Sequence, residues 1–382
     1  QAAYFGKRVA LVEARDLGGV CVHTGTIPSK ALRESALCLS GLRTRGIAGV
    51  TTPAPSDIRV ADLMAHREQV SHECAEGVEN NLLRHNVDVV RGRGTLLDQH
   101  TVEVSLEGGG TRTLTSSYVL ISTGSRPRRP DWVPFDGVEV YDSDDILNLD
   151  YVPSSLIVIG AGVIGSEYAS IFAALGVEVT LVDPHEQVLP FLDEDVRESL
   201  FDSFAHLGLK MQTGVKVSGV RVEAVDRVAV DLENGQSIVA EKLLFAAGRS
   251  GNTEGLGLAN VGIEVNNRGL IQVDEHYRTA CPSIYAAGDV IGFPALASTS
   301  MDQGRLAMCH AFDLQYKDTI PDRGHLPFGI YTIPSCSMIG ETSQGLRSRG
   351  EDFEIGLSRF DVNPRGGISG GRRGLLKLIF RP

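Results

Sequence analysis

Three glycines in the middle of the chain have the spacing of a phosphate-binding loop. Gly160, Gly162 and Gly165 form a G-x-G-x-x-G run, and Asp183 follows 23 residues after the first of them. In such a loop the first glycine permits a tight turn, the second lets the backbone approach a pyrophosphate, and the third lets the helix pack closely. An acidic residue about 20 residues further on commonly binds an adenosine ribose. These four residues therefore predict a dinucleotide site.

The elements around this motif have the order that a dinucleotide-binding unit needs. The apolar run over 156–159 predicts a buried parallel strand. A helical stretch then extends to Leu175, Gly176 breaks it, and a second predicted strand over 177–182 ends at Asp183. The glycine motif alone is weak, but within a strand, turn, helix and strand it favours a nucleotide site over a coincidental turn.

A second unit of this kind is predicted at the start of the chain. Residues 7–13 have the pattern of a strand that ends in an acid, Glu13, but only 12 residues precede that acid. We therefore expect a first strand and its glycine-rich loop upstream of Gln1, with Glu13 as the acid of that unit. The alternative is that Glu13 is an ordinary solvated carboxylate at a strand end.

Three further predicted strands end in turns of small residues. Each strand together with its turn covers 119–125, 243–249 or 283–289. The residues of interest at their ends are Thr123, Gly124, Gly248, Gly288 and Asp289. A carboxylate such as Asp289 can accept a hydrogen bond from a ribityl hydroxyl. With the two units above, these strands predict an α/β fold that contains two Rossmann-like dinucleotide-binding domains.

The composition argues against several classes of partner. A net charge of −12 disfavours nucleic acid and an anionic membrane surface. The sequence has no apolar run of about 18 residues and no segment of the signal type. Its six cysteines have neither CxxC pairs nor metal-ligand spacing. We therefore expect no disulfide framework and no metal site, and a reduced cytoplasmic setting fits best.

Near the N-terminus, residues 18–30 read GGVCVHTGTIPSK, so that Cys21 is followed five residues later by Thr26. This run resembles the redox loop of the flavoprotein disulfide reductases with one sulfur removed. Two thiols at these positions can close into a disulfide and carry electrons from a flavin to a second substrate. Cys21 alone cannot do so. The resemblance therefore implies a flavin that exchanges electrons directly with whatever else reaches it.

The whole chain resembles the flavoprotein disulfide reductases, an FAD- and NAD-linked family. Within that family it is similar to the soluble (Si-specific) pyridine nucleotide transhydrogenases. The segments that carry this similarity are GTIPSKALR, YDSDDIL, GAGVIGSEYASIF, GRSGNT, YAAGDVIGFPALAS and PFGIYTIP. Thr26 in the cysteine position is the most discriminating of these features, whereas GAGVIG and AAGD occur throughout the family.

This resemblance implies FAD, NAD and NADP as cofactors. It places Glu13 at the adenosine ribose of FAD and Cys21 beside the isoalloxazine. Thr123 and Gly124 would line the FAD site, and Asp289 would hold the ribityl chain.

The resemblance also implies that Lys30 lies near the flavin N5 and pairs with Glu167. An ammonium there stabilises negative charge on a reduced flavin, and a carboxylate keeps the lysine protonated. The alternatives are that Lys30 is a solvated helix lysine and that Glu167 is an acid favoured by the helix dipole.

Four segments follow from the same resemblance. They are an N-terminally incomplete FAD-binding domain over 1–140, an NAD(P)-binding domain over 141–262, a return segment of the FAD domain over 263–322, and a C-terminally incomplete interface domain over 323–382. A homodimer or higher homo-oligomer is expected for the full-length protein. Residues 44–56 predict a loop, because they contain two prolines between helical stretches. Ser335 stands where the family pattern has an acid.

We interpret the chain as an FAD-dependent oxidoreductase that transfers a hydride between NADPH and NAD+ through the flavin, without a redox-active disulfide. Because only one nicotinamide site is visible, the two nucleotides would bind in turn. One alternative is an NADH-dependent diaphorase, quinone reductase or dihydrolipoamide dehydrogenase-like flavoprotein. The other is a non-catalytic nucleotide-binding fragment.

Overall fold

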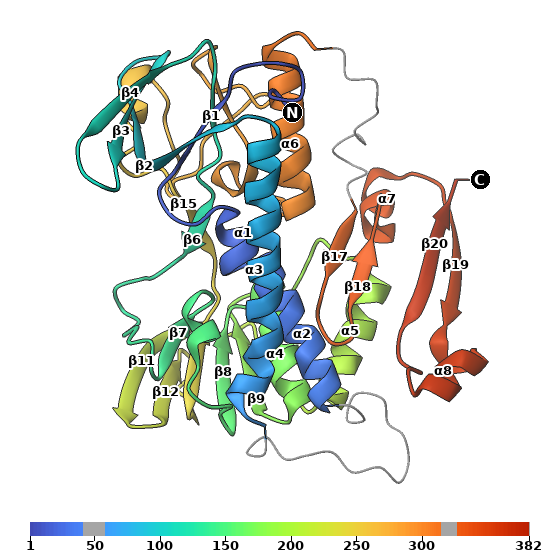
Figure 1. Ribbon diagram of the computed structural model, residues 1–382. Helices are drawn as coiled ribbons and strands as arrows, with labels where there is room; N and C mark the ends of the chain where they lie inside the picture. The colour runs from blue at the N-terminus through green and yellow to red at the C-terminus, as the bar shows by residue number, and fades with distance from the viewer. Residues whose placement is uncertain (41–57, 315–326, 382) are drawn as a thin grey trace. The chain divides into compact units, whose positions relative to one another are not determined.

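A computed structural model describes residues 1–40, 58–314 and 327–381. The chain forms two compact units, each built from segments that are far apart in the sequence (Figure 1). Unit 1 comprises Gln1–Pro28, Gln69–Pro127 and Arg249–Ile320, and unit 2 comprises Ser29–Glu68, Arg128–Gly248 and Pro321–Pro382. The loop predicted over 44–56 lies outside the described residues.

A five-stranded parallel sheet forms the centre of unit 2. Its order is β10-β9-β8-β14-β7. The strands are β7 (Val140–Asp142), β8 (Ser155–Ile159), β9 (Glu178–Asp183), β10 (Lys210–Thr213) and β14 (Lys242–Phe245). Helix α4 (Val163–Leu175) connects β8 to β9 and ends at Gly176, whose φ of 94° lies in the left-handed region that glycine favours. The predicted strand, helix and strand around the glycine motif are confirmed.

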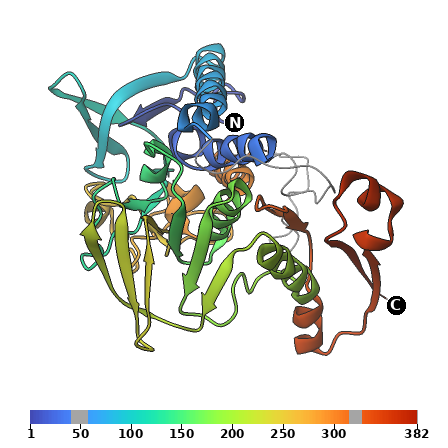
Figure 2. The same ribbon diagram turned by 90° about the horizontal axis from the view of Figure 1, so that it is seen from below.

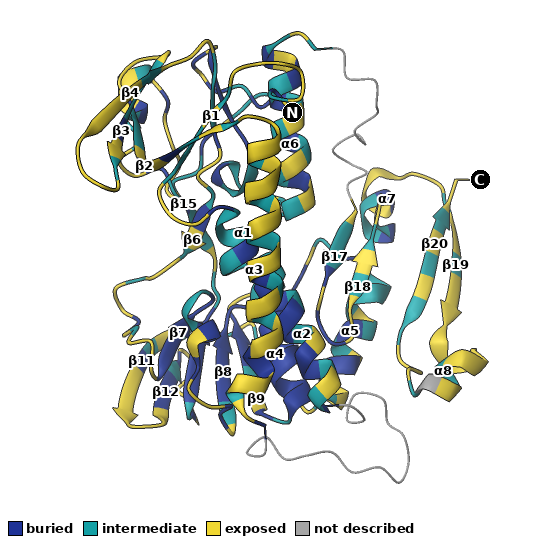
Figure 3. Cartoon of the chain, in the orientation of Figure 1, coloured by how far each residue is buried: buried dark blue, intermediate teal, exposed yellow. Residues whose placement is uncertain are grey.

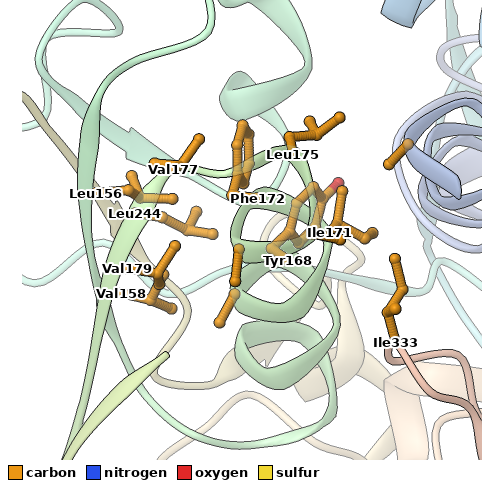
Figure 4. Close-up of a cluster of buried hydrophobic side chains, with 14 of the residues drawn as sticks. Leu156, Val158, Tyr168, Ile171, Phe172, Leu175, Val177, Val179, Leu244 and Ile333 are labelled. Atoms are coloured by element: carbon orange, nitrogen blue, oxygen red, sulfur yellow. The ribbon is translucent and has the colours of Figure 1, made fainter. Parts of the chain in front are cut away.

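Figure 2 shows the central strands of unit 2 from below. Alternate residues of these strands pack with two different layers. Leu156 and Val158 pack with α4, as Figure 4 shows, whereas Ile157 and Ile159 pack with a three-stranded antiparallel sheet. That sheet consists of β11 (Val217–Ala224), β12 (Arg227–Leu232) and β13 (Ser237–Ala240). Because both faces of β8 are covered, its sequence is apolar at every position from 156 to 159.

The remaining elements of unit 2 surround this sheet. They are most of α2 (Thr26–Ser40), the first part of α3 (Val60–Arg84), η2 (Asp145–Asn148), α5 (Glu194–His206), α7 (Ser343–Arg349), η6 (Phe360–Val362) and α8 (Pro364–Ser369). Two antiparallel pairs complete the unit, β17 (Phe328–Ile330) with β18 (Cys336–Met338), and β19 (Glu354–Arg359) with β20 (Leu375–Phe380). Figure 3 shows α4 and the central strands as buried, while β19 and β20 remain partly exposed.

Unit 1 contains a four-stranded sheet in the order β1-β2-β3-β4. Its strands are β1 (Ala10–Glu13), β2 (Asp88–Leu96), β3 (Thr101–Leu106) and β4 (Thr111–Thr115), of which only β1 and β2 pair in parallel. Two smaller pairs are β5 (Val119–Ile121) with β16 (Ile284–Ala286), and β6 (Ser125–Pro127) with β15 (Arg249–Gly251). The unit also holds α1 (Gly19–His23), η3 (Leu258–Val261), η4 (Gly288–Ile291) and α6 (Ala297–Ala311).

The three strands predicted to end in turns of small residues are present. They are β5, β14 and β16. The strands stop before Gly124, Gly248 and Gly288, whose φ angles of 70°, 103° and 81° are incompatible with a continued strand. The small residues therefore form the turns that end these strands, as predicted.

Two structural absences concern only the described ranges 1–40, 58–314 and 327–381. Within them, no helix combines the length and apolarity needed to cross a membrane. In the same ranges, no three His, Cys, Asp or Glu side chains gather as a group that could hold a metal ion.

A buried lysine joins three elements of unit 2. The Nζ of Lys377 on β20 donates to Asp193 at 2.7 Å and to the Oγ of Ser343 at 2.7 Å, and it also pairs with Asp195. The Lys377 and Asp193 side chains are 4% and 7% exposed. Asp193 is the N-cap of α5, and Ser343 opens α7. Burial by itself raises the pKa of Asp193, but hydrogen bonds from Lys377 and Ser343 outweigh burial and leave that pKa below its ordinary value.

Replacement of this lysine should destabilise unit 2. We expect Lys377→Met to lower the free energy of unfolding by about 3 kcal/mol, because it leaves Asp193 buried without its countercharge. Since the pKa of Asp193 is lowered in the folded state, this contribution is present above the unfolded-state pKa. It is lost as the pH falls below about 4. Urea unfolding at neutral and acidic pH measures both effects.

Lys210 offers a matched control, because it forms an ion pair with Glu178 in which both side chains are more than half exposed. Lys210→Met should change the free energy of unfolding by less than about 1 kcal/mol. Equal losses in the two variants would contradict the assigned role of Lys377.

Candidate nucleotide and redox site

The glycine-rich loop between β8 and α4 has three different packing environments. The φ of Gly160 is 101°, and a Cβ there would lie 2.8 Å from the backbone of Ala246. A Cβ on Gly165 would lie 1.8 Å from the carbonyl oxygen of Gly160, so the helix begins in direct contact with the loop. A Cβ on Gly162 would meet nothing within 4 Å. Gly162 is the N-cap of the 13-residue helix α4, where a phosphate is electrostatically favoured. The loop therefore has room for a pyrophosphate at Gly162.

Asp183 ends β9 beside this loop. One carboxylate oxygen accepts the backbone N–H of Ala161 at 2.7 Å. The other accepts the backbone N–H of His185 at 2.9 Å and lies 2.8 Å from its Nδ1. The Asp183 residue is only 9% exposed. Its carboxylate is thus held at the end of a parallel strand, where an acid can accept a ribose hydroxyl.

Lys30 and Glu167 form an ion pair in unit 2. The Lys30 Nζ lies 3.0 and 2.9 Å from the two Glu167 carboxylate oxygens, and it donates to Ser29 Oγ at 3.2 Å. The Glu167 side chain is 4% exposed and that of Lys30 is 28% exposed. The ammonium thus neutralises a buried carboxylate and still reaches solvent. The alternative of a solvated Lys30 does not describe this pair, whereas these contacts do not test the helix-dipole alternative for Glu167.

The segment before β18 completes the surroundings of the pair. The backbone N–H of Tyr331 donates to Glu167 Oε1 at 2.9 Å. The Lys30 Nζ lies 4.9 Å from the centroid of the Tyr331 ring, within the range of a cation–π contact. Burial and the nearby Glu167 carboxylate raise the pKa of Cys336 to about 11. Cys336 is therefore a neutral thiol at pH 7.

Asp289 lies within a separate polar cluster in unit 1. Its carboxylate accepts the Ser125 hydroxyl at 2.7 Å and lies 4.0 Å from the Arg249 guanidinium. Arg249 also donates to the hydroxyl and the carbonyl of Ser125, at 2.7 and 2.9 Å. The Asp289 side chain is 26% exposed. It can therefore accept a ligand hydroxyl while its own position stays fixed.

The other predicted FAD residues of unit 1 occupy strand ends and turns. Glu13 ends the parallel strand β1, and its Oε1 accepts the backbone N–H of Arg15 at 2.9 Å. Thr123 and Gly124 lie between β5 and β6, and Asn252 bonds the carbonyl oxygens of both at 3.0 Å. A Cβ on Gly124 would meet nothing within 4 Å. Each position is compatible with a bound nucleotide.

Cys21 lies on the short helix α1, and Thr26 is the first residue of α2. Between them, the buried hydroxyl of Thr24 has no hydrogen-bond partner among the residues that the structure describes. A buried hydroxyl without a partner costs about 1–3 kcal/mol. A ligand that bonds this hydroxyl would remove that cost, so the loop also fits a bound polar cofactor.

Within each unit, the structure brings together some of the residues that the sequence singled out. In unit 2 it joins Lys30 with Glu167, and the glycine loop with Asp183. Sequence reasoning missed Ser125 and Arg249 at Asp289, and Tyr331 at Glu167. Ser125 and Arg249 are the last residues of the predicted segments 119–125 and 243–249, and Tyr331 lies in the PFGIYTIP segment, so the sequence contained a signal for each of them.

Comparison with known proteins shows that most of the chain matches one protein family. The model of the family described as "Pyridine nucleotide-disulphide oxidoreductase" matches residues 1–304. A protein of Mycobacterium bovis named "Soluble pyridine nucleotide transhydrogenase" is 45% identical, over 99% of this chain and 80% of that protein. A protein of the same name from Pseudomonas fluorescens is 42% identical, over 99% of this chain and 81% of its own.

Solved structures agree with this comparison. The crystal structure of LpdA from Mycobacterium tuberculosis has a TM-score of 0.91 and 28% identity, over 100% of this chain and 83% of that one. The HOCl-induced flavoprotein disulfide reductase RclA from Escherichia coli has a TM-score of 0.84 and 28% identity, over 99% of this chain and 82% of its own.

Alanine substitutions in the glycine loop should separate binding from folding. We expect Gly165→Ala to lower the free energy of unfolding by about 3 kcal/mol, because its Cβ would overlap the Gly160 carbonyl. Gly162→Ala should change that free energy by less than about 1 kcal/mol, because its Cβ meets open space. The same variant should weaken NADH binding about tenfold by occupying the space that a pyrophosphate needs.

Thermal unfolding and NADH titration of both variants measure these effects. If Gly162→Ala binds NADH as the wild type does, the nucleotide backbone does not approach this loop.

Proposed function

Because the chain belongs to the pyridine nucleotide-disulphide oxidoreductase family, we propose that it is an FAD-dependent transhydrogenase. In this proposal it transfers a hydride from NADPH to NAD+ through the flavin, and both nucleotides use the site at Gly160–Gly165 in turn. Transfer on the Si face of the flavin is part of the proposal.

One observation carries this proposal, namely the residue five positions after Cys21. Thr26 has no thiol, so Cys21 cannot form with it the disulfide that would pass electrons to a second substrate. Electrons would then pass directly from the flavin to an acceptor that reaches it, and in this proposal that acceptor is NAD+. The relatives at 45% and 42% identity are named transhydrogenases, which favours this reading over a diaphorase, a quinone reductase or a nucleotide-binding fragment.

The nicotinamide nucleotides are assigned to unit 2. The N–H groups at the start of α4 would bind the pyrophosphate, and Gly162 would allow its close approach. Asp183 would accept an adenosine ribose hydroxyl, since Ala161 and His185 hold its carboxylate in place. Gly248, where a Cβ would meet nothing within 4 Å, would leave room beside the nucleotide.

The FAD residues are assigned to unit 1. Glu13 would bind the adenosine ribose, Thr123 and Gly124 would line the site, and Gly288 with Asp289 would hold the ribityl chain. The Ser125 hydroxyl and the Arg249 guanidinium hold the Asp289 carboxylate in position for that task. When bound, the flavin supplies two-electron storage by hydride acceptance and release.

Lys30 and Glu167 are assigned the electrostatic role at the redox centre. The buried Glu167 carboxylate holds the Lys30 side chain in an ion pair at 2.9 Å. The held ammonium would stabilise the negative charge that the flavin gains from the hydride. Cys21 is assigned a place beside the flavin ring without a covalent step.

Domain limits, assembly and location complete the proposal. The FAD domain would cover 1–140 and 263–322, the NAD(P) domain 141–262 and the interface domain 323–382. A homodimer or higher homo-oligomer is supported by apolar side chains that are about half exposed on β20, namely Leu376, Leu378 and Phe380. A cytoplasmic location is supported by the word "soluble" in the names of the relatives.

The charge assignment predicts a specific kinetic effect. Lys30→Met should slow reduction of the flavin by NADPH by roughly 10- to 100-fold, because the positive charge at the redox centre is lost. The affinity for NADPH should change little, since Lys30 is not assigned to the nucleotide. Stopped-flow absorbance at several NADPH concentrations separates the two parameters.

Arg33 supplies the control, because its Nε donates to the Thr332 carbonyl at 2.9 Å and anchors the same segment without contacting Glu167. In Arg33→Met, NADPH should therefore reduce the flavin at close to the wild-type rate. If flavin reduction slows equally in both variants, Lys30 acts only by holding the segment around Thr332 in place.

The lone thiol gives the direct test of the proposed function. With FAD bound, the wild type should transfer hydride from NADPH to NAD+ but should not reduce lipoamide or glutathione disulfide. Cys21→Ser should retain most of the NADPH-to-NAD+ activity, because no covalent step uses the thiol. Coupled absorbance assays with each acceptor measure these rates.

Two results would refute the proposal. If NADPH cannot reduce the flavin, the diaphorase alternative replaces it. If Cys21→Ser loses several orders of magnitude of activity while FAD stays bound, the thiol is part of the chemistry.

A further inference from the structure

The proposed function places an unusual demand on the site at the end of β9. NAD(H) and NADP(H) differ by a 2′-phosphate on the adenosine ribose, and an acid at this position favours the nucleotide without it. Asp183 is such an acid. The inference below rests on the proposed function and concerns how one site accepts both nucleotides.

The hydrogen bonds of Asp183 oppose any rotation of its side chain away from an entering phosphate. Its two oxygens already accept N–H groups from Ala161 and His185, at 2.7 and 2.9 Å, on two sides of the carboxylate. The side chain is 12% exposed, so solvent screens it only in part. A change of Asp183 conformation is therefore a poor way to admit NADP(H), and a change of charge next to it is a better one.

His185 is placed to make that change of charge. Its Nδ1 lies 2.8 Å from Asp183 Oδ1, and its side chain is 80% exposed. An ionised carboxylate can only accept, so the proton on this ring stays at Nδ1, and a second proton adds at Nε2. Protonation would thus neutralise Asp183 and create an additional N–H donor on the solvent side of the ring.

Other charges around His185 do not replace it. Residues 184–196 contain no arginine and no lysine. Glu186 adds a second negative charge, and its side chain lies against Gly214. The backbone N–H of Gly214 donates to the His185 carbonyl oxygen. Lys216, two residues further on, has its Nζ 4.0 Å from a carboxylate oxygen of Glu233. Lys210 on the neighbouring strand pairs with Glu178.

We propose that His185 selects between the two nucleotides at this site. Its protonated form accepts the 2′-phosphate of NADP(H), and its neutral form leaves Asp183 to favour NAD(H). Histidine is suited to this task, because its charge changes within the physiological pH range. An arginine here would favour NADP(H) at every pH, and an uncharged residue would favour NAD(H) at every pH.

Equilibrium titration of NAD+ and NADP+ against the FAD-loaded full chain tests this proposal without turnover. The measured quantity is the ratio of the NADP+ and NAD+ dissociation constants at about pH 6.5 and about pH 8.5, both above the phosphate pKa of about 6. In the wild type at the higher pH, NAD+ should bind about tenfold more tightly than NADP+. The ratio should fall by roughly tenfold at the lower pH.

Three variants complete the experiment. His185→Gln should keep the high ratio at both pH values, and His185→Arg should keep a low ratio at both. His72 is the matched control, because it is 75% exposed and lies 3.3 Å from the carboxylate of Glu76 on α3. His72→Gln should leave the wild-type pH dependence unchanged.

Two results would overturn the assignment of His185. One is a wild-type ratio that does not change with pH, and the other is the same pH dependence in His185→Gln. Both leave the proposed hydride transfer intact. Failure of NADP+ and NAD+ to bind at either pH would instead refute the proposed function itself.

Discussion

A buried carboxylate on helix α4 is the constraint on which much of unit 2 depends. Glu167 has little solvent to stabilise its charge, so it requires a countercharge and hydrogen-bond donors from the protein. Lys30 supplies the charge from α2, and the Tyr331 backbone supplies a donor from the segment before β18. Three stretches of chain more than 130 residues apart are thereby fixed around one side chain. The same arrangement holds an ammonium where it reaches solvent on one side.

The carboxylate at the end of β9, in the same βαβ unit, is stabilised in a different way. Asp183 is also mostly buried, but backbone N–H groups stabilise it together with one exposed imidazole. Hydrogen bonds from backbone amides favour an ionised carboxylate without adding a net charge. The result is a carboxylate at the end of β9 that is held by backbone amides and lies beside an exposed imidazole. One acid of this βαβ unit is thus paired with a lysine, and the other with a histidine.

The chemistry proposed for this chain needs no thiol relay. The family to which the chain belongs is named for disulphide chemistry, yet position 26 offers a hydroxyl that cannot accept electrons. The polar groups that remain around the proposed redox centre bind and stabilise charge, and Cys336 stays neutral because its pKa is raised to about 11. A site of this kind suits hydride exchange between nucleotides, in which charge moves but no protein bond forms.

Local sequence patterns determined the elements of this protein and the identity of many site residues. The glycine spacing, the apolar run of β8 and the acid at the end of β9 are all encoded within about 30 residues, because strand, turn and helix are local structures. The ends of β5, β14 and β16 were encoded locally too, because a glycine after each strand tolerates the left-handed φ that the turn needs.

Only the tertiary structure decided which residues meet. The contacts of Glu167 with Tyr331, and of Asp289 with Ser125, span 164 residues each, and no local pattern relates such positions. The role of Lys377 could not be predicted for the same reason. A lysine in a strand is expected to be exposed, and only the fold brings Asp193 and Ser343 next to it. Sequence spacing sets what a short segment can form, whereas burial and charge pairing depend on segments that meet only when the chain folds.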